Sequence, residues 1–389
     1  MDFDDSAEET AFRAEVVAWL SSVAKLRSEG GVGWRRFRAK SHEDDVRYLD
    51  EARAWQHQMV DAGYAGVHWP KEHGGRGLSG ILAGIVEQER AKYDVPGNLF
   101  MVGIDMAGPT LMAHGTPAQQ TRWLQATLRG DVVWCQLFSE PGAGSDLASL
   151  STRAERDGDG WRVTGQKVWT SQAHLADYGM LLARTDPAAS KHAGITFFVL
   201  DMHSPGVDVR PLRQIDGAVH FNEVFLDDVW VPDDHRVGEV NGGWPVARTT
   251  LTAERTAIGE GGIISCAEVL DLARRNGADR HPVLRQELVR LHTRRELQRW
   301  LSLRAKTAVA SGRMPGPEAS VLKLLNSQRV AHLGDLVLSL QGAGGTLWHD
   351  DAVDEGFWQD TFLYQWSSRI GGGTEQIQRN IIGERVLGL

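Results

Sequence analysis

The chain has 389 residues, a formal net charge of −9 and two cysteines, Cys135 and Cys266. The acidic balance argues against nucleic-acid binding, because phosphate recognition needs clustered Lys and Arg. Two isolated cysteines argue against a disulfide framework and a cysteine-based zinc site, so we expect no bound metal. The acidic start and the lack of any run of about 18 apolar residues predict no membrane span and a cytoplasmic location.

Residues 1–130 are predicted to form a helical domain. Apolar residues recur at helical spacing in four segments, at 11–26, 46–62, 79–92 and 100–114. Thr116 and Pro117 then predict the start of a further helix, with Thr116 as its N-cap and Pro117 at its first position.

Residues 131–240 change period and are predicted to form a β domain. Short apolar or alternating runs are separated by turn residues, such as the Asp-Gly-Asp-Gly stretch at 157–160, and this pattern is typical of strands. The runs are 132–138, 161–170, 180–184, 195–202, 207–212 and 221–231.

Residues 241–389 return to the helical period and are predicted to form a bundle, because long helices with apolar stripes pack against one another. One stripe comprises Leu284, Leu288, Leu291, Leu297 and Leu301, and another comprises Leu322, Leu325, Leu333, Leu336 and Leu340.

Four short segments carry residues suited to a ligand. Residues 139–146, Ser-Glu-Pro-Gly-Ala-Gly-Ser-Asp, follow an apolar run and form either an ordinary turn or one that presents backbone N–H groups to an electron-rich ligand. Residues 165–171, Gly-Gln-Lys-Val-Trp-Thr-Ser, end in an aromatic and two hydroxyls. Trp169 there either packs in the core or forms a wall for a flat ring whose polar edge meets the hydroxyls.

The other two segments are rich in glycine. Residues 341–345, Gln-Gly-Ala-Gly-Gly, follow a long amphipathic segment and provide either a helix C-cap or a close backbone approach to a ligand. Residues 369–379 place three glycines before a helix with Thr374 as N-cap, and the N–H groups of such a helix start suit an anionic or polar cofactor.

In this order and spacing, the four segments resemble the acyl-CoA dehydrogenase family, and the resemblance covers essentially the whole chain. It implies an α+β fold with an N-terminal helical domain, a middle β-barrel domain and a C-terminal four-helix bundle. It further implies FAD bound between the β domain and the bundle, with a neighbouring subunit completing the site in a tetramer.

The resemblance also implies which residues contact the cofactor and the substrate. Ser145 matches a position near both the flavin and the acyl-CoA, and Arg255 matches a CoA-contacting arginine. The flavin edge would be met by Leu137, Phe138, Ser139, Trp169, Thr170 and Ser171. The adenine-side half of FAD would be met by Gln341, Gly344 and Gly345 of a neighbouring subunit, and Thr374 and Gln376 match FAD-contacting positions of the terminal motif.

The catalytic base departs from the commonest family pattern. Many members place a glutamate directly before the C-terminal Gly-Thr, where this chain has Gly372. A minority, including isovaleryl and long-chain types, place it on the first helix after the β domain and directly before an arginine, as at Glu254 here. We therefore expect Glu254 to be the base, whereas Glu140 in its turn and Glu375 at its helix start have structural explanations.

A second departure concerns an Arg-x-x-Phe-Gly motif that helps many family members to hold the FAD pyrophosphate. Its arginine corresponds to Arg275, but Ala278 and Asp279 replace Phe and Gly, and Arg280 lies nearby. Arg275 is therefore expected to contact FAD through an altered element.

The resemblance implies α,β-dehydrogenation of an acyl-CoA thioester in lipid metabolism, with electrons passing to an electron-transfer flavoprotein. A flavin oxidase or monooxygenase on the same scaffold is one alternative, although a nitroalkane oxidase would be expected to use Asp where this chain has Glu254. A structural subunit of a heteromeric acyl-CoA dehydrogenase is another. A homotetramer, or a heterotetramer with a related chain, is expected.

Overall fold

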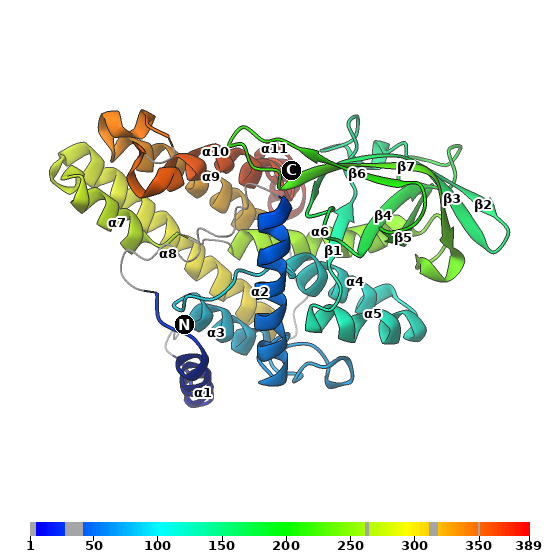
Figure 1. Ribbon diagram of the computed structural model, residues 1–389, viewed down its shortest axis with the longest axis horizontal. Helices are drawn as coiled ribbons and strands as arrows, with labels where there is room; N and C mark the ends of the chain where they lie inside the picture. The colour runs from blue at the N-terminus through cyan, green and yellow to red at the C-terminus, as the bar shows by residue number, and fades with distance from the viewer. Residues whose placement is uncertain (1–4, 28–41, 261–263, 311–317, 349–350) are drawn as a thin grey trace. The chain divides into compact units, whose positions relative to one another are not determined.

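The computed structural model describes residues 5–27, 42–260, 264–310, 318–348 and 351–389 (Figure 1). The chain divides into two compact units, which are described separately. The first unit comprises residues 1–35, 79–95 and 255–389, and the second comprises residues 36–78 and 96–254. Along the chain the elements run from helices to strands and back to helices, which confirms the predicted α+β class.

The first unit is helical. Its principal core buries Leu272, Leu291, Leu336 and Trp358, so parts of both predicted leucine stripes lie inside. Leu297 is an exception, because its side chain is 48% exposed. The helices are α1 (Ala7–Val23), α3 (Gly80–Arg90), α7 (Cys266–Arg275), α8 (Pro282–Ala310), α9 (Glu318–Ser339), α10 (Phe357–Ile370) and α11 (Glu375–Ile382).

The second unit joins helices to a sheet. Its helices are α2 (His42–Asp61), α4 (Gly108–His114), α5 (Pro117–Arg129) and α6 (Gly243–Glu260), the last of which passes into the first unit at Arg255. A π-helical stretch, η3 (Val102–Ala107), precedes α4. Thr116 caps α5 as predicted, and its hydroxyl accepts from Gln119 N while the Gln119 side chain returns to Thr116 N.

The eight strands form one sheet with the order β6-β7-β3-β2-β4-β5-β8, and β1 pairs with β4 in parallel. In the described residues no pairing links the two end strands, β6 and β8. The strands are β1 (Trp134–Leu137), β2 (Arg153–Asp157), β3 (Gly160–Ser171), β4 (Tyr178–Arg184), β5 (Ile195–Asp201), β6 (Val207–Leu212), β7 (Phe221–Pro232) and β8 (Arg236–Val237).

The sequence pattern missed β2. Only Ala154 of its five residues is buried, so the strand carries no apolar run to mark it. Its position comes instead from the antiparallel ladder with β3, which pairs Arg153 with Thr164 and Asp157 with Gly160. Across the described ranges, none of the helices combines the length and apolarity that a bilayer crossing requires.

Candidate functional site

The end of β1 and the end of β3 lie together in the second unit. Ser139 O accepts a hydrogen bond from Val168 N at 2.9 Å, and Phe138 O accepts one from Lys167 Nζ at 3.1 Å. Leu137 and Phe138 are buried, and the Phe138 ring meets Phe197 edge to face. The fold thus brings together the two segments, 137–139 and 169–171, that were expected to meet one edge of a flavin.

Trp169 has an unusual conformation for a strand residue. Its φ is +60°, and its side chain is 63% exposed. A positive φ is unfavourable for a bulky residue, and here it falls within an irregularity of the β3–β7 pairing, between Lys167 and Thr170. The exposed indole forgoes apolar burial. The ring meets Phe221 in a T-shaped arrangement with centroids 6.2 Å apart, and its large exposed fraction leaves room for a flat ligand.

The hydroxyl of Thr170 is buried, and in the described residues its Oγ1 has no hydrogen-bond partner. An unsatisfied buried hydroxyl costs free energy that a polar ligand atom can recover. Ser171 follows it and is half-buried. An exposed indole beside an unsatisfied hydroxyl fits the ring and polar edge of the expected flavin.

A buried ion pair lies behind these segments. Lys167 Nζ is 2.8 Å from Glu140 Oε1, and the other Glu140 oxygen accepts from Ser151 N at 2.6 Å. Burial raises the pKa of Glu140, but the Lys167 ammonium and the hydrogen bonds outweigh it and bring the pKa to about 2. Burial lowers the pKa of Lys167 to about 8 against the opposing attraction of Glu140. Glu140 is therefore a structural anion that joins two motifs.

Ser145 lies at the exposed end of the turn after β1. Its neighbour Asp146 accepts from Ser149 Oγ and from Lys191 Nζ, and these contacts hold the loop. A side chain at Gly142 or Gly144 would meet nothing within 4 Å, so the local packing does not require either glycine. Open space around a glycine-rich turn is consistent with a ligand that approaches the backbone closely.

Glu254, the expected base, lies on α6 at the boundary of the second unit. Its Oε2 accepts a hydrogen bond from Gln136 Nε2 on β1 at 3.2 Å. One turn earlier, Thr250 Oγ1 is 2.9 Å from Thr110 Oγ1, and both residues are buried. Residues 110, 136 and 250 thus fix the helix that carries the carboxylate. Arg255 follows on the same helix and is half-buried.

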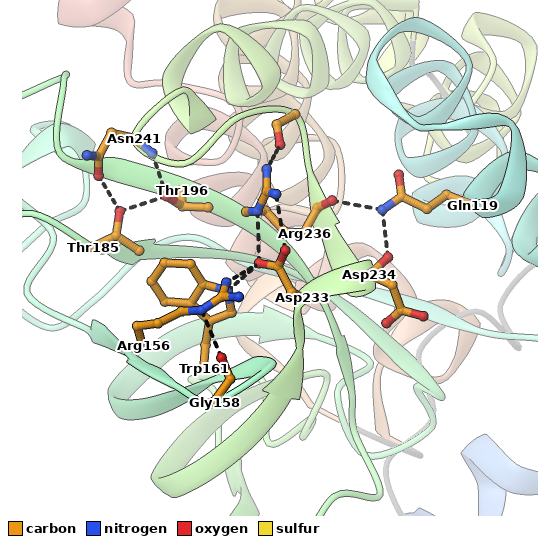
Figure 2. Close-up of polar contacts among 11 residues, drawn as sticks. Gln119, Arg156, Gly158, Trp161, Thr185, Thr196, Asp233, Asp234, Arg236 and Asn241 are labelled. Carbon is orange, nitrogen blue, oxygen red and sulfur yellow. Dashed lines mark hydrogen bonds and ion pairs between the residues drawn. The ribbon is translucent and has the colours of Figure 1, made fainter.

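A polar network anchors the segment that leads into α6 (Figure 2). Asp233 Oδ1 accepts hydrogen bonds from Arg156 at 2.7 Å, Trp161 Nε1 at 2.8 Å and Arg236 Nε at 3.1 Å. The hydrogen bond from Arg236 is the main cause that holds the pKa of Asp233 well below its usual range. Gln119 Nε2 donates to the carbonyl oxygens of residues 234 and 236, so α5 also supports this segment.

A separate group of hydrogen bonds lies just before the start of α6 (Figure 2). Thr185 Oγ1 donates to Asn241 Oδ1 at 2.5 Å, and Asn241 N donates to Thr196 Oγ1 at 2.8 Å. A side chain at Gly243 would meet Thr196 and Phe197 backbone atoms at 2.6 Å, so only glycine fits there. The entry to the helix of Glu254 is therefore fixed against strands β4 and β5.

In the first unit, Arg275 is engaged by carboxylates of its own chain. Its Nε donates to Asp271 at 2.8 Å, and its NH2 donates to Asp354 at 2.8 Å. Asp354 also accepts from Trp358 Nε1 at 2.7 Å and has a φ of +55°. These ion pairs compete with the expected contact between Arg275 and a pyrophosphate.

The glycine-rich segment 341–345 ends α9. Gln341 Nε2 donates to Val337 O at 2.9 Å, and Gln341 Oε1 accepts from Gln359 at 3.3 Å. A side chain at Gly345 would lie 2.6 Å from Leu338 O, whereas one at Gly344 would meet nothing within 4 Å. The fold itself therefore explains Gly345, and Gly344 is left as a position where a ligand can approach.

The last segment begins α11 as expected. Thr374 Oγ1 accepts from Ile377 N at 3.3 Å, and Gln376 in the first turn is exposed. Gly372 has a φ of +68° and lacks a side chain. Glu375 forms ion pairs with Arg369 at 3.2 Å and with Arg379 at 3.1 Å, which gives this carboxylate a structural role.

The sequence did not predict the residues that hold the site in place. Gln136 and Asp233 carried no local signal, because their contacts join positions far apart in the chain. The Glu140–Lys167 ion pair could have been predicted. Each of two motifs in the β domain carries one charged residue of opposite sign, and the fold brings the two motifs together. In the described ranges no group of three or more His, Cys, Asp or Glu residues could hold a metal ion.

Comparison with known proteins assigns each part of the chain. Residues 33–131, 135–229 and 241–387 match the N-terminal, middle and C-terminal domains of acyl-CoA dehydrogenases. Acyl-CoA dehydrogenase IpdE1 of Mycobacterium tuberculosis is 40% identical over 97% of each chain. The solved structure of the Tcur3481-Tcur3483 steroid ACAD covers 100% of this chain and 99% of its own, with a TM-score of 0.83 and 30% identity. The ChsE4-ChsE5 complex of M. tuberculosis gives a TM-score of 0.79 at 28% identity, over 100% and 99% of the two chains.

Proposed function

This chain belongs to the acyl-CoA dehydrogenase family of FAD-dependent oxidoreductases, and from that premise we propose that it converts an acyl-CoA thioester to the trans-2-enoyl-CoA. The observation that carries the proposal is Glu254, a carboxylate with a defined hydrogen-bond partner on a helix fixed by buried contacts. No side chain at Gly372 can take its place, and Glu375 is already engaged by two arginines.

In this proposal Glu254 removes the α proton of the thioester as a general base. Bound FAD supplies the acceptor for the hydride that leaves the β carbon. Ser145 and Arg255 contact the acyl-CoA, and the buried contact of Thr250 limits movement of the helix that carries Glu254. Positioning of this kind contributes to catalysis because it removes the entropic cost of alignment from the reaction step.

The proposed FAD contacts come from the four motifs identified in the sequence. In the second unit, the exposed Trp169 indole and the unsatisfied Thr170 hydroxyl support contact with the isoalloxazine ring, together with Ser171 and residues 137–139. We assign the adenine-side contacts to Gln341, Gly344 and Gly345 of a neighbouring subunit, and further FAD contacts to Thr374 and Gln376. Arg275 is better explained as a structural residue in this chain, because Asp271 and Asp354 already bind its guanidinium.

We further propose a tetramer, either of this chain alone or with a related chain, that passes electrons to an electron-transfer flavoprotein. Two observations favour the heteromeric form. The solved relatives at 30% and 28% identity are named as pairs, Tcur3481-Tcur3483 and ChsE4-ChsE5. In addition, the engaged Arg275 weakens one of the contacts that an identical neighbour would offer to FAD.

The acyl group is proposed to be bulky and to contain rings, because one of the solved relatives is a steroid ACAD. The lack of a side chain at Gly372, a position close to the reacting carbons in the family, supports this choice by removing steric bulk.

A substrate panel tests the function. The chain, purified alone and with a related partner chain, would be assayed with straight, branched and ring-containing acyl-CoA thioesters and a ferrocenium acceptor. We expect FAD in the purified protein, an enoyl product by mass spectrometry and the highest kcat/KM with a bulky acyl group. Protein that cannot bind FAD in either preparation would refute the proposal, and rapid oxygen consumption without another acceptor would indicate an oxidase instead.

A further inference from the structure

Strand β1 brings a neutral amide to the carboxylate of Glu254, and we propose that Gln136 is a positioning residue that orients this carboxylate for proton abstraction. The hydrogen bond from Gln136 Nε2 to Glu254 Oε2 measures 3.2 Å and joins residues 118 positions apart. The inference rests on the proposed function, because it requires Glu254 to act as the base.

The backbone around Gln136 is fixed by its strand pairing. In the parallel ladder with β4, Gln136 pairs with Met180, and its neighbours pair with Gly179 and Leu181. Side chains alternate along a strand, so Gln136 shares its face with Trp134. Trp134 is buried, donates from Nε1 to Thr127 Oγ1 at 2.8 Å and packs against Trp123. The amide therefore projects from a rigid support.

The other end of the hydrogen bond is equally well supported. Thr250 lies four residues before Glu254, on the same side of α6, and contacts Thr110 in the core. Thr249 Oγ1 is 2.8 Å from His114 Nε2 on α4. Because both backbones are held, the main remaining freedom is rotation of the long Glu254 side chain. The hydrogen bond from Gln136 restricts this rotation.

The chemistry of an amide suits this task. Gln136 donates a hydrogen bond to a carboxylate, yet it has no proton to exchange in the range where a glutamate titrates. It can therefore orient the base without competing for the substrate proton.

Replacement of Gln136 by Leu removes the donor and retains most of the volume. In the FAD-loaded enzyme with its best acyl-CoA, Gln136→Leu should lower kcat by about 10- to 100-fold, the range expected for a misplaced catalytic group. KM and FAD content should change little. The α-deuterium isotope effect should rise because proton abstraction becomes slower, a signature that a general loss of stability does not produce.

Gln56→Leu is the matched control. Gln56 is a buried amide in the same unit, but it donates to the carbonyl oxygen of Leu128 at 2.7 Å and not to a carboxylate. We expect this variant to lose stability while it keeps the wild-type isotope effect. If Gln136→Leu does not fold, the isosteric Gln136→Glu serves instead, and its like charge beside Glu254 should reduce kcat at least as much.

A spectroscopic measurement tests the contact without turnover. The infrared difference between the wild type and Glu254→Gln isolates the carboxylate stretch of Glu254, and that band should shift in Gln136→Leu but not in Gln56→Leu. An unmoved band together with an unchanged isotope effect would overturn the inference and leave the dehydrogenase assignment intact. Failure of every preparation to oxidise any acyl-CoA would overturn the proposed function, and the inference with it.

Discussion

Lys167 Nζ lies 2.8 Å from Glu140 Oε1, and the two side chains are 0% and 4% exposed. The pair connects the turn after β1 with strand β3, and the same ammonium binds Phe138 O. An ion pair so deeply buried holds its surroundings together only while both charges are present, because either one alone would be desolvated without compensation.

We therefore predict that Lys167→Met lowers the free energy of unfolding by about 3–5 kcal/mol, the usual cost of stranding a buried charge. FAD retention should fall as well, because Phe138 and Ser139 lose support. The double variant Glu140→Gln/Lys167→Met should recover part of the stability. Lys191→Met breaks a solvent-exposed pair with Asp146 and should change little. Urea unfolding and flavin absorbance check this, and a Lys167→Met protein as stable as the wild type would contradict it.

Acid should destabilise the protein by protonating Glu140 of the same ion pair. The pKa of Glu140 in the folded protein is about 2, below its ordinary value of 4.5, so the carboxylate's contribution is present above pH 4.5 and is lost as the pH falls towards 2. Below pH 4.5 the wild type should therefore lose stability with a steeper slope than Glu140→Gln/Lys167→Met. Unfolding measured over that interval at fixed ionic strength compares the slopes, and parallel slopes would rule out this origin of acid sensitivity.

The choice between two carboxylates can be tested by matched substitutions. Glu254→Gln should reduce kcat by at least about 100-fold, the low end of general-base contributions, while FAD and acyl-CoA binding persist. Glu375→Gln should keep most of the turnover, because the ion pairs of Glu375 with Arg369 and Arg379 indicate a structural role. The opposite result, with an active Glu254→Gln and an inactive Glu375→Gln, would show that the base had been misassigned.

Arg275 should behave as a structural residue. Arg275→Gln removes ion pairs to Asp271 and Asp354 and should lower the free energy of unfolding by roughly 1 kcal/mol, since the site is partly exposed. FAD content should be unchanged. Arg274→Gln, at the exposed neighbouring position, is the control for a lost positive charge. Thermal unfolding and flavin content together distinguish a structural role of Arg275 from a cofactor contact. Loss of FAD at unchanged stability would support the cofactor contact.

Local patterns predicted much of the fold. The Thr116 cap and the change from helical to alternating periods identified real elements, because these features depend on neighbours within a few residues. Strand β2 escaped because a mostly exposed strand lacks an apolar run. Leu297 was placed in a core stripe but is exposed, since periodicity alone does not show which apolar face of a long helix is covered.

The sequence likewise predicted some residues of the candidate site and not others. Glu254 and the flavin-facing segments were predicted because they match family motifs along the sequence, and their roles stay predictions until tested. Gln136 and Asp233 could not be found in this manner. Each acts through contacts that exist only after strands and helices distant in the chain have packed, and no spacing in the sequence records them.

The alternation of side chains along β1 limits how this region can change during evolution or engineering. Gln136 faces the helix of Glu254, and the next residue begins the segment assigned to the flavin. An insertion or deletion of one residue would turn the amide to the side of Cys135, which contacts Met202, and would displace Phe138 from Lys167. A change of length in this stretch would therefore disturb both the base and the flavin segment, and tags or permuted termini belong elsewhere.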